Sequence, residues 1–179
     1  MKTTSLLRYV VSLAFVAVAI LVIANGVGAQ RGNVDWSAVG LSTHHVAGTV
    51  HYLEGRGGNI GLSVGDDGVI MIDDQYAPLT DRIVETIRGL STAEIKWLIN
   101  THVHPDHTGG NENLGNRGVP ILAQDRVRLR LAATQPKAAL PVLTYSDDVT
   151  IHLNGEEVHI VPVPPAHTDG DSIIHFKNS

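Results

Sequence analysis

The stretch that decides the fold is residues 100–111, which read NTHVHPDHTGGN. It follows residues 95–99 (IKWLI), an apolar run typical of a short buried strand. Divalent metals of borderline softness bind imidazole nitrogen and carboxylate oxygen, and this stretch offers His102, His104, Asp106 and His107. Because side chains alternate along an extended chain, His102 and His104 project to the same side. The pattern predicts a metal-binding loop at the carboxyl end of a strand, where open α/β sheets place their ligands.

The same loop carries residues that favour a sharp turn after the histidines. Pro105 stiffens the chain, and Gly109 and Gly110 permit a bend where the next helix begins. The alternative interpretation is a solvated histidine-rich turn. At the histidine and aspartate frequencies of this chain, H-x-H-x-D-H arises by chance about once in several hundred cases. The loop is therefore interpreted as a metal site.

A second loop, residues 164–172 (PPAHTDGDS), contains a further histidine between two predicted strands. His167 alone is a weak signal, because single histidines in loops are common. Together with the first loop, it is well placed to supply a third imidazole to the same ion.

Outside the two loops, the chain alternates short strands and helices, with no internal repeat and no linker. Strands are predicted at residues 49–53, 59–64, 69–73, 95–99, 120–123, 149–153, 158–163 and 172–176, and helices at 80–88, near 111–114 and at about 125–132. Thr80 is expected to cap the first helix and Gly89 to end it. This order predicts an α/β layered fold.

Amino-acid composition excludes several kinds of site and partner. The chain has 179 residues, of which 43% are hydrophobic and 17% charged, as in one ordinary globular domain. It has no cysteine, which excludes disulfides, thiolate metal ligands and cysteine nucleophiles. The formal net charge is −5, so we expect no binding to nucleic acid through charge.

Residues 1–29 have the layout of a secretory signal peptide. Lys2 and Arg8 precede the apolar residues 10–24, and small residues at 27–29 form a cleavage site after Ala29. The alternative is an uncleaved membrane anchor, since the apolar run is near the short end of what spans a bilayer. Cleavage would leave a domain at residues 30–179, secreted or periplasmic and without stable membrane association.

The two loops together resemble the metallo-β-lactamase superfamily. The resemblance rests on H-x-H-x-D-H followed by Gly109-Gly110, on A-H-T-D-G-D-S at residues 166–172, and on the hairpin at residues 59–73. It implies an αββα sandwich with a binuclear metal site, usually zinc. The resemblance assigns His102, His104 and His167 to the first metal and Asp106 and His107 to the second. Asp73 would support the metal loop from the end of its strand.

The resemblance also sets limits on the site. Asp169 and Asp171 are interpreted as loop and strand-start residues. The remaining histidines are interpreted as exposed or half-buried positions outside the site: His44, His45, His51, His152, His159 and His175. Family members supply a bridging aspartate and a further histidine after the third-histidine loop. None follows here, so we expect an N-terminal fragment of the sandwich, with the C-terminal part missing.

The function implied by the resemblance is that of an exported zinc-dependent hydrolase with one or two ions, iron or manganese being alternatives. A bound metal lowers the pKa of its water to about 7, so metal-bound hydroxide would attack a carbonyl-type small-molecule substrate: a β-lactam, a lactone or a thioester. Asp106 would anchor the second metal and orient the nucleophile, which makes it the predicted catalytic residue. Two alternatives stay open: a non-haem iron oxidoreductase or sulfur dioxygenase on the same scaffold, and a non-catalytic truncated metal-binding protein. The sequence predicts no oligomeric state.

Overall fold

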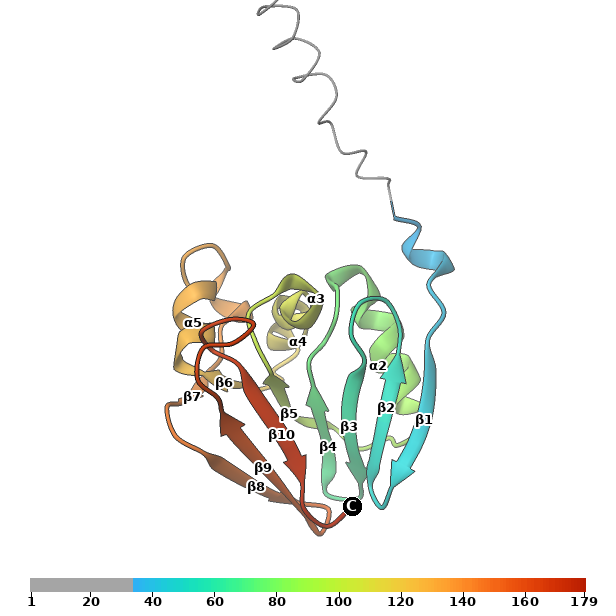
Figure 1. Ribbon diagram of the computed structural model, residues 1–179. Helices are drawn as coiled ribbons and strands as arrows, with labels where there is room; N and C mark the ends of the chain where they lie inside the picture. Colours follow the sequence, from blue (N-terminus) through green and yellow to red (C-terminus); the bar gives the residue numbers. More distant parts are fainter. Residues whose placement is uncertain (1–33) are drawn as a thin grey trace, which may run out of the picture. The chain divides into compact units, whose positions relative to one another are not determined.

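The computed structural model of the chain describes residues 34–179, so the predicted signal peptide at residues 1–29 lies outside the described residues. The larger sheet has seven strands that follow one another in chain order (Figure 1). The first four are antiparallel: β1 (Ser42–Ala47), β2 (Val50–Glu54), β3 (Ile60–Gly65) and β4 (Gly68–Ile72). The other three continue from β4 in parallel: β5 (Ile95–Asn100), β6 (Ile121–Gln124) and β7 (Leu143–Tyr145).

A second, smaller sheet is antiparallel, in the order β10-β9-β8. Its strands are β8 (Val149–Leu153), β9 (Glu156–Pro162) and β10 (Ser172–Phe176). The helices are α2 (Thr80–Arg88), α3 (Pro105–Thr108), α4 (Asn111–Asn116) and α5 (Asp125–Leu131), with 3-10 turns η1 (Trp36–Ala38), η2 (Ala77–Leu79) and η3 (Lys137–Ala139). None of these helices has the length and apolarity needed to cross a lipid bilayer.

The central strand β4 shows how the layers form. All five of its residues are buried, and successive side chains point to opposite faces. Val69 and Met71 belong to a core shared with α2 and α4, whereas Ile70 and Ile72 pack against the smaller sheet. Residues 34–179 therefore form a helical layer, a seven-stranded sheet and a three-stranded sheet. This mixed architecture confirms the predicted α/β fold class.

The start of α2 differs from the prediction. Thr80 does not cap the helix: the cap position is Leu79, which makes no side-chain capping bond. The physical reason is that η2 runs directly into α2, so the hydroxyl of Thr80 donates to the carbonyl oxygen of Ala77 instead. Gly89 does end the helix, as expected.

The parallel strands position the candidate site. Because β4, β5 and β6 run in the same direction, their carboxyl ends meet at one edge of the sheet. Asp73 follows β4 at this edge, the histidine loop follows β5, and α5 follows β6 directly. Segments distant in sequence are thus brought beside one another.

Gly115 allows α4 to pack against η3. A Cβ atom at this position would overlap the backbone carbonyl oxygen of Ala138. We expect Gly115→Ala to lower the free energy of unfolding by about 2–3 kcal/mol, measured by urea denaturation, because a backbone atom cannot move aside cheaply. Gly40→Ala is the matched control, since a Cβ there meets nothing within 4 Å. Equal stability of the two variants would contradict this packing.

Candidate metal centre

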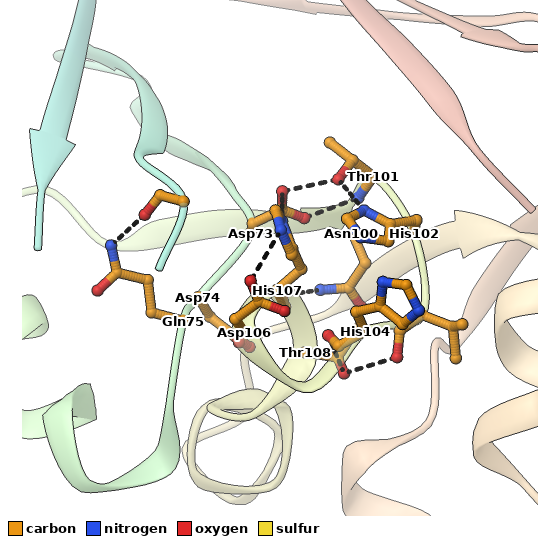
Figure 2. Close-up of polar contacts among 12 residues, drawn as sticks. Asp73, Asp74, Gln75, Asn100, Thr101, His102, His104, Asp106, His107 and Thr108 are labelled. Carbon is orange, nitrogen blue, oxygen red and sulfur yellow. Dashed lines mark hydrogen bonds and ion pairs between the residues drawn. The ribbon is translucent and has the colours of Figure 1, made fainter. Parts of the chain in front are cut away.

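The histidine loop is shaped by the start of α3. His104 is the last extended residue before this helix, with φ −68° and ψ 150°. Pro105 occupies the first turn, where its missing N–H is not needed. The hydroxyl of Thr108 donates to the carbonyl oxygen of His104 at 3.1 Å. The chain therefore turns back just after His104 and brings the later residues of the loop beside the earlier ones (Figure 2).

Three imidazoles from two loops converge at this turn. One ring nitrogen from each of His102, His104 and His167 lies within 4.8 Å of the other two. Nδ1 of His104 and Nε2 of His167 are 2.8 Å apart. The ring centroid of His102 is 5.0 Å from that of His104 and 4.9 Å from that of His167. Among residues 34–179, no other group of three or more such ligand atoms converges in this way. We refer to these three residues as the histidine triad.

His102 is the inner member of the triad. The residue is 9% exposed, and its Nδ1 lies 3.1 Å from the hydroxyl of Thr101. Its Nε2 is buried with no hydrogen-bond partner in the described chain. Burial, together with the neighbouring His107, lowers the pKa of His102 below its ordinary value, so the ring is neutral at pH 7. A neutral imidazole with a free lone pair is what a metal ligand requires.

The three ligand atoms of the triad are close enough to share one metal ion. Ligand atoms about 2.0–2.1 Å from zinc are about 3.3 Å apart in a tetrahedral site. Nδ1 of His104 and Nε2 of His167 are 2.8 Å apart, and no two of the three ligand atoms are more than 4.8 Å apart. The unpartnered nitrogen of His102 and the all-imidazole ligand set suit a divalent transition-metal ion. His102, His104 and His167 are therefore the residues that would hold it.

Asp73 joins the histidine loop to the end of β4. Its side chain is 6% exposed, and its backbone has φ 63°, a conformation that aspartate tolerates better than most residues. One carboxylate oxygen accepts from the backbone N–H of Thr101 at 2.7 Å. The other accepts from the hydroxyl of Thr101 at 2.7 Å and lies 2.7 Å from Nδ1 of His107 (Figure 2). The carboxylate thus occupies the supporting position that the resemblance implied.

His107 and Asp106 lie beside the triad but outside it. The ring centroids of His107 and His102 are 4.0 Å apart, and Nε2 of His107 is 3.5 Å from Oδ2 of Asp106. Burial lowers the pKa of His107, but the hydrogen bond to Asp73 and the charges of Asp73 and Asp106 outweigh it and raise the pKa above its ordinary value. A second metal held by Asp106 and His107 stays a prediction, because no third residue of the described chain completes a ligand group with them.

The loop that carries His167 is held in place by two aspartates. The carboxylate of Asp171 accepts from the backbone N–H groups of His167 at 2.7 Å and Thr168 at 2.9 Å. Asp169 forms a two-bond ion pair with Arg130 of α5, at 2.5 and 2.8 Å. Neither aspartate belongs to the triad. Both shape the loop, in keeping with their interpretation as loop and strand-start residues.

A buried contact ties the two histidine loops together. The backbone N–H of Ser172 donates to the carbonyl oxygen of Thr101 at 2.9 Å. The hydroxyl of Tyr145 donates to Oγ of Ser172 at 2.7 Å. Burial raises the pKa of Tyr145 to about 12, so this hydroxyl keeps its proton at neutral pH. The start of β10 is thereby fixed beside the residue that precedes His102.

Comparison with known proteins decides the family. A family model described as the metallo-beta-lactamase superfamily matches residues 53–179, a range that includes both histidine loops. The chain belongs to the metallo-beta-lactamase superfamily. The fold is therefore one whose other members are mostly hydrolases and usually bind metal ions.

Solved metallo-beta-lactamases share the fold. GOB-18 from Elizabethkingia meningoseptica superposes with a TM-score of 0.69 at 21% identity, over 82% of this chain and 59% of that one. BJP-1, a subclass B3 enzyme of Bradyrhizobium japonicum, gives 0.68 at 20% identity, over 79% and 58%. The enzyme from Pontibacter korlensis gives 0.65 at 19% identity, over 76% and 67%. The chain thus spans 58% to 67% of the length of these proteins.

A curated relative carries a different name. Subunit alpha of 2,4-dinitroanisole O-demethylase from Nocardioides sp. (strain JS1661) is 28% identical over 120 residues. The match covers 64% of this chain and 36% of the relative, so the chain spans about a third of that protein.

Besides His107, six histidines lie outside the triad of this metallo-beta-lactamase fold. His44 stacks on Tyr52 at 4.6 Å, and His45 lies against His51 at 4.9 Å, both across β1 and β2. Nε2 of His159 is 2.9 Å from Asp148. With His152 and His175, all six occupy exposed or half-buried strand positions, as predicted.

A buried polar layer beneath the loop was not predicted. Asn100 and Asn111 exchange hydrogen bonds of 2.9 and 3.0 Å through their amides. Asn100 also donates to the carbonyl oxygen of His107 at 3.2 Å. Asp74 and Gln75, directly after Asp73, are each 1% exposed. The available signal was a run of three polar residues continuing straight on from an apolar strand.

Asp74 makes the folding stability of the chain depend on pH. Oδ1 of Asp74 accepts from the backbone N–H of Gly110 at 2.9 Å, whereas Oδ2 is buried with no partner among the described residues. Burial raises the pKa of Asp74 well above its ordinary value, despite the bond from Gly110, and the charge of Asp73 adds to the effect. The folded chain therefore retains a proton that the unfolded chain releases near pH 4, so this carboxyl makes folding less favourable as the pH rises toward the raised pKa.

Asp74→Asn is expected to remove this loss of folding stability at rising pH, because asparagine keeps the acceptor oxygen and carries no charge. The gain in free energy of unfolding over the unsubstituted chain is expected to be larger at pH 8 than at pH 5, because the unsubstituted carboxyl is destabilising only above the pH at which the unfolded chain releases its proton. Urea denaturation with a chelator present would measure it. Asp66→Asn, at an exposed turn position, is the control. The same gain at both pH values would contradict the assignment.

Proposed function

We propose that the chain carries the core of a zinc-dependent hydrolase that acts on a carbonyl-type small molecule: a β-lactam, a lactone or a thioester. The observation that supports this most strongly is the histidine triad, with the buried, unpartnered Nε2 of His102 at its inner side. His167 is exposed, so the triad is open to solvent on that side. Export of the mature chain to the periplasm or medium is part of the proposal and rests on residues 1–29.

The residues of this chain prepare the site for such chemistry. When bound, zinc supplies a water molecule with a pKa near 7 and polarises the carbonyl of the substrate. His102 is held neutral by burial, which keeps its lone pair available. The carboxylate of Asp73 accepts a hydrogen bond from Nδ1–H of His107 and so directs Nε2 of that ring toward Asp106. Asp106, whose side chain is 35% exposed, is proposed to orient the nucleophile or to anchor a second ion.

The proposal is tested by metal content and turnover together. The purified chain is stripped with a chelator, reloaded with zinc and assayed with nitrocefin, a lactone and a thioester. We expect one or two zinc ions per chain and turnover of at least one substrate, lost again on chelation. His159→Ala, outside the triad, is expected to behave as the unsubstituted chain. Absence of bound zinc, or turnover that survives chelation, would overturn the proposal. Bound iron with oxygen consumption would favour the oxidoreductase alternative.

The match to the O-demethylase subunit favours a second candidate, cleavage of an aryl methyl ether. The name of that relative says that it acts on 2,4-dinitroanisole. Incubation of the zinc-loaded chain with this compound, followed by the absorbance of released dinitrophenolate, tests the second candidate in the same preparation. Turnover of the ether without turnover of any carbonyl substrate would replace the first candidate by the second.

A further inference from the structure

A glycine loop between β2 and β3 borders the metal centre. Residues 55–58 read GRGG. A Cβ atom at Gly57, where φ is 90°, would lie 3.1 Å from Cβ of Asp106 and 3.4 Å from Cε2 of Tyr76. A Cβ atom at Gly58 would lie 3.0 Å from Cε1 of His107. The backbone of this loop is therefore in direct contact with the predicted catalytic residue and with its neighbouring ring.

Buried Gln75 fixes the position of this loop. Its Oε1 accepts from the backbone N–H of Arg56 at 3.1 Å. Its Nε2 donates to the carbonyl oxygen of Gly58 at 2.5 Å, the dashed line at Gln75 in Figure 2. Gln75 is 1% exposed and lies two residues after Asp73. The strand end that supports the histidine loop thus also holds the glycine loop, so Arg56 projects from a defined backbone.

An aromatic pair and a guanidinium lie beside the glycine loop. The rings of Tyr76 and Trp36 have centroids 5.1 Å apart, tilted by 49°. The guanidinium carbon of Arg56 lies 5.7 Å from the centroid of the Trp36 ring. A guanidinium over a ring face keeps N–H groups in its own plane, and these match the two oxygens of a carboxylate. Arg56 is exposed, and the two rings are half-buried. We call Tyr76, Trp36 and Arg56 the aromatic row.

We propose that the aromatic row is the recognition site for the substrate, and that the substrate is an aromatic compound bearing a carboxylate. Its reacting group would lie at the triad, its ring against Tyr76 and Trp36, and its carboxylate at Arg56. Charge sets this orientation, because Asp106 beside His107 repels an anion and the exposed guanidinium of Arg56 attracts one. The placement of the reacting group at the triad rests on the proposed function. The binding of the ring and its carboxylate does not.

Binding to the metal-free chain tests the row without any turnover. Calorimetry compares 2-naphthoate with 2-naphthalenemethanol, which has the same ring system and no charge. We expect the naphthoate to bind about tenfold more tightly and Arg56→Gln to abolish that preference. Arg56→Lys is expected to restore only part of it, since an ammonium lacks the planar fork. Trp36→Leu is expected to weaken both ligands alike.

Arg88→Gln is the matched control. Arg88 is an exposed arginine at the end of α2, lining a cavity of about 290 Å³ with Glu94 and Ile95 at the start of β5. The histidine loop follows the opposite end of that strand. We expect this variant to bind both ligands as the unsubstituted chain does. Loss of the preference in Arg88→Gln, its persistence in Arg56→Gln, or equal binding of the two ligands by the unsubstituted chain would overturn the proposal.

Kinetics separate this proposal from the proposed function. With the zinc-loaded chain and two aryl esters that differ only in a ring carboxylate, Arg56→Gln is expected to raise KM about tenfold for the charged ester. KM for the neutral ester and kcat for both are expected to stay within about twofold. If the loaded chain hydrolyses nothing while naphthoate still binds through Arg56, the proposed function fails and the recognition site stands. If the loaded chain hydrolyses both esters and Arg56→Gln raises KM equally for both, the proposed function stands and the recognition site fails.

Discussion

Alanine at His102 is expected to lower the affinity of the chain for zinc by at least about a hundredfold, since even residues that only support metal ligands cost ten- to a hundredfold when changed. The reason is specific to this ring: its Nε2 is buried and has no hydrogen-bond partner among the described residues, so no hydrogen bond within the described chain competes with the ion for this nitrogen. Competition against a chromophoric chelator measures the affinity directly. His167→Ala is expected to cause a similar loss through removal of an exposed ring.

The two variants control for each other. His102 is 9% exposed and its removal can disturb packing, whereas His167 is exposed and its removal leaves the core untouched. His159→Ala removes an imidazole that pairs with Asp148 on the smaller sheet and should leave zinc affinity unchanged. A chain that binds zinc equally well without His102 or without His167 would not contain the proposed metal centre.

Asp73→Ala is expected to lower the free energy of unfolding of the metal-free chain by about 3 kcal/mol. Two donors on Thr101 and Nδ1 of His107 would lose their acceptor in a region where water cannot replace it, since the Asp73 side chain is 6% exposed. Urea denaturation at pH 7 measures the loss. The zinc affinity should fall as well, by about tenfold, because Thr101 precedes His102 and fixes its backbone.

Two further variants make this result interpretable. Asp73→Asn keeps one acceptor oxygen and tolerates the left-handed backbone, so its stability should lie between those of the unsubstituted chain and the alanine variant. Asp66→Ala, at an exposed turn position, should change the free energy of unfolding by no more than about 0.5 kcal/mol. If Asp73→Ala proved no more damaging than Asp66→Ala, the carboxylate would not be supporting the loop.

Local pattern was enough to predict much of this fold. The helix at residues 80–88 and the strands at 149–153 and 172–176 have the predicted bounds, because each has a clear apolar period and a turn residue beside it. β1 (Ser42–Ala47) and β7 (Leu143–Tyr145) were missed. β1 is polar on both faces and β7 has three residues, so neither shows a periodic signal.

Some residues of the candidate site could likewise be predicted from local sequence, and others could not. His102 and His104 could be selected because their spacing carries chemistry on its own, and His167 because its loop, taken together with theirs, resembles a known family. The aromatic row could not, since Trp36, Arg56 and Tyr76 are separated by twenty residues at each step and only the tertiary fold brings them into contact. Asp74 was missed for a related reason: an aspartate after a strand suggests a turn, and only its packing under Gly110 shows that it is buried.

The triad draws its ligands from both sheets: two imidazoles follow β5 of the seven-stranded sheet, and the third lies between β9 and β10 of the three-stranded one. An ion bound there would be a cross-link between layers that otherwise adhere mainly through apolar contact. Loading should therefore raise the melting temperature as free zinc exceeds its dissociation constant. Amide exchange should slow most in β9 and β10, where local opening would pull a ligand away, and least in the distant hairpin of β1 and β2.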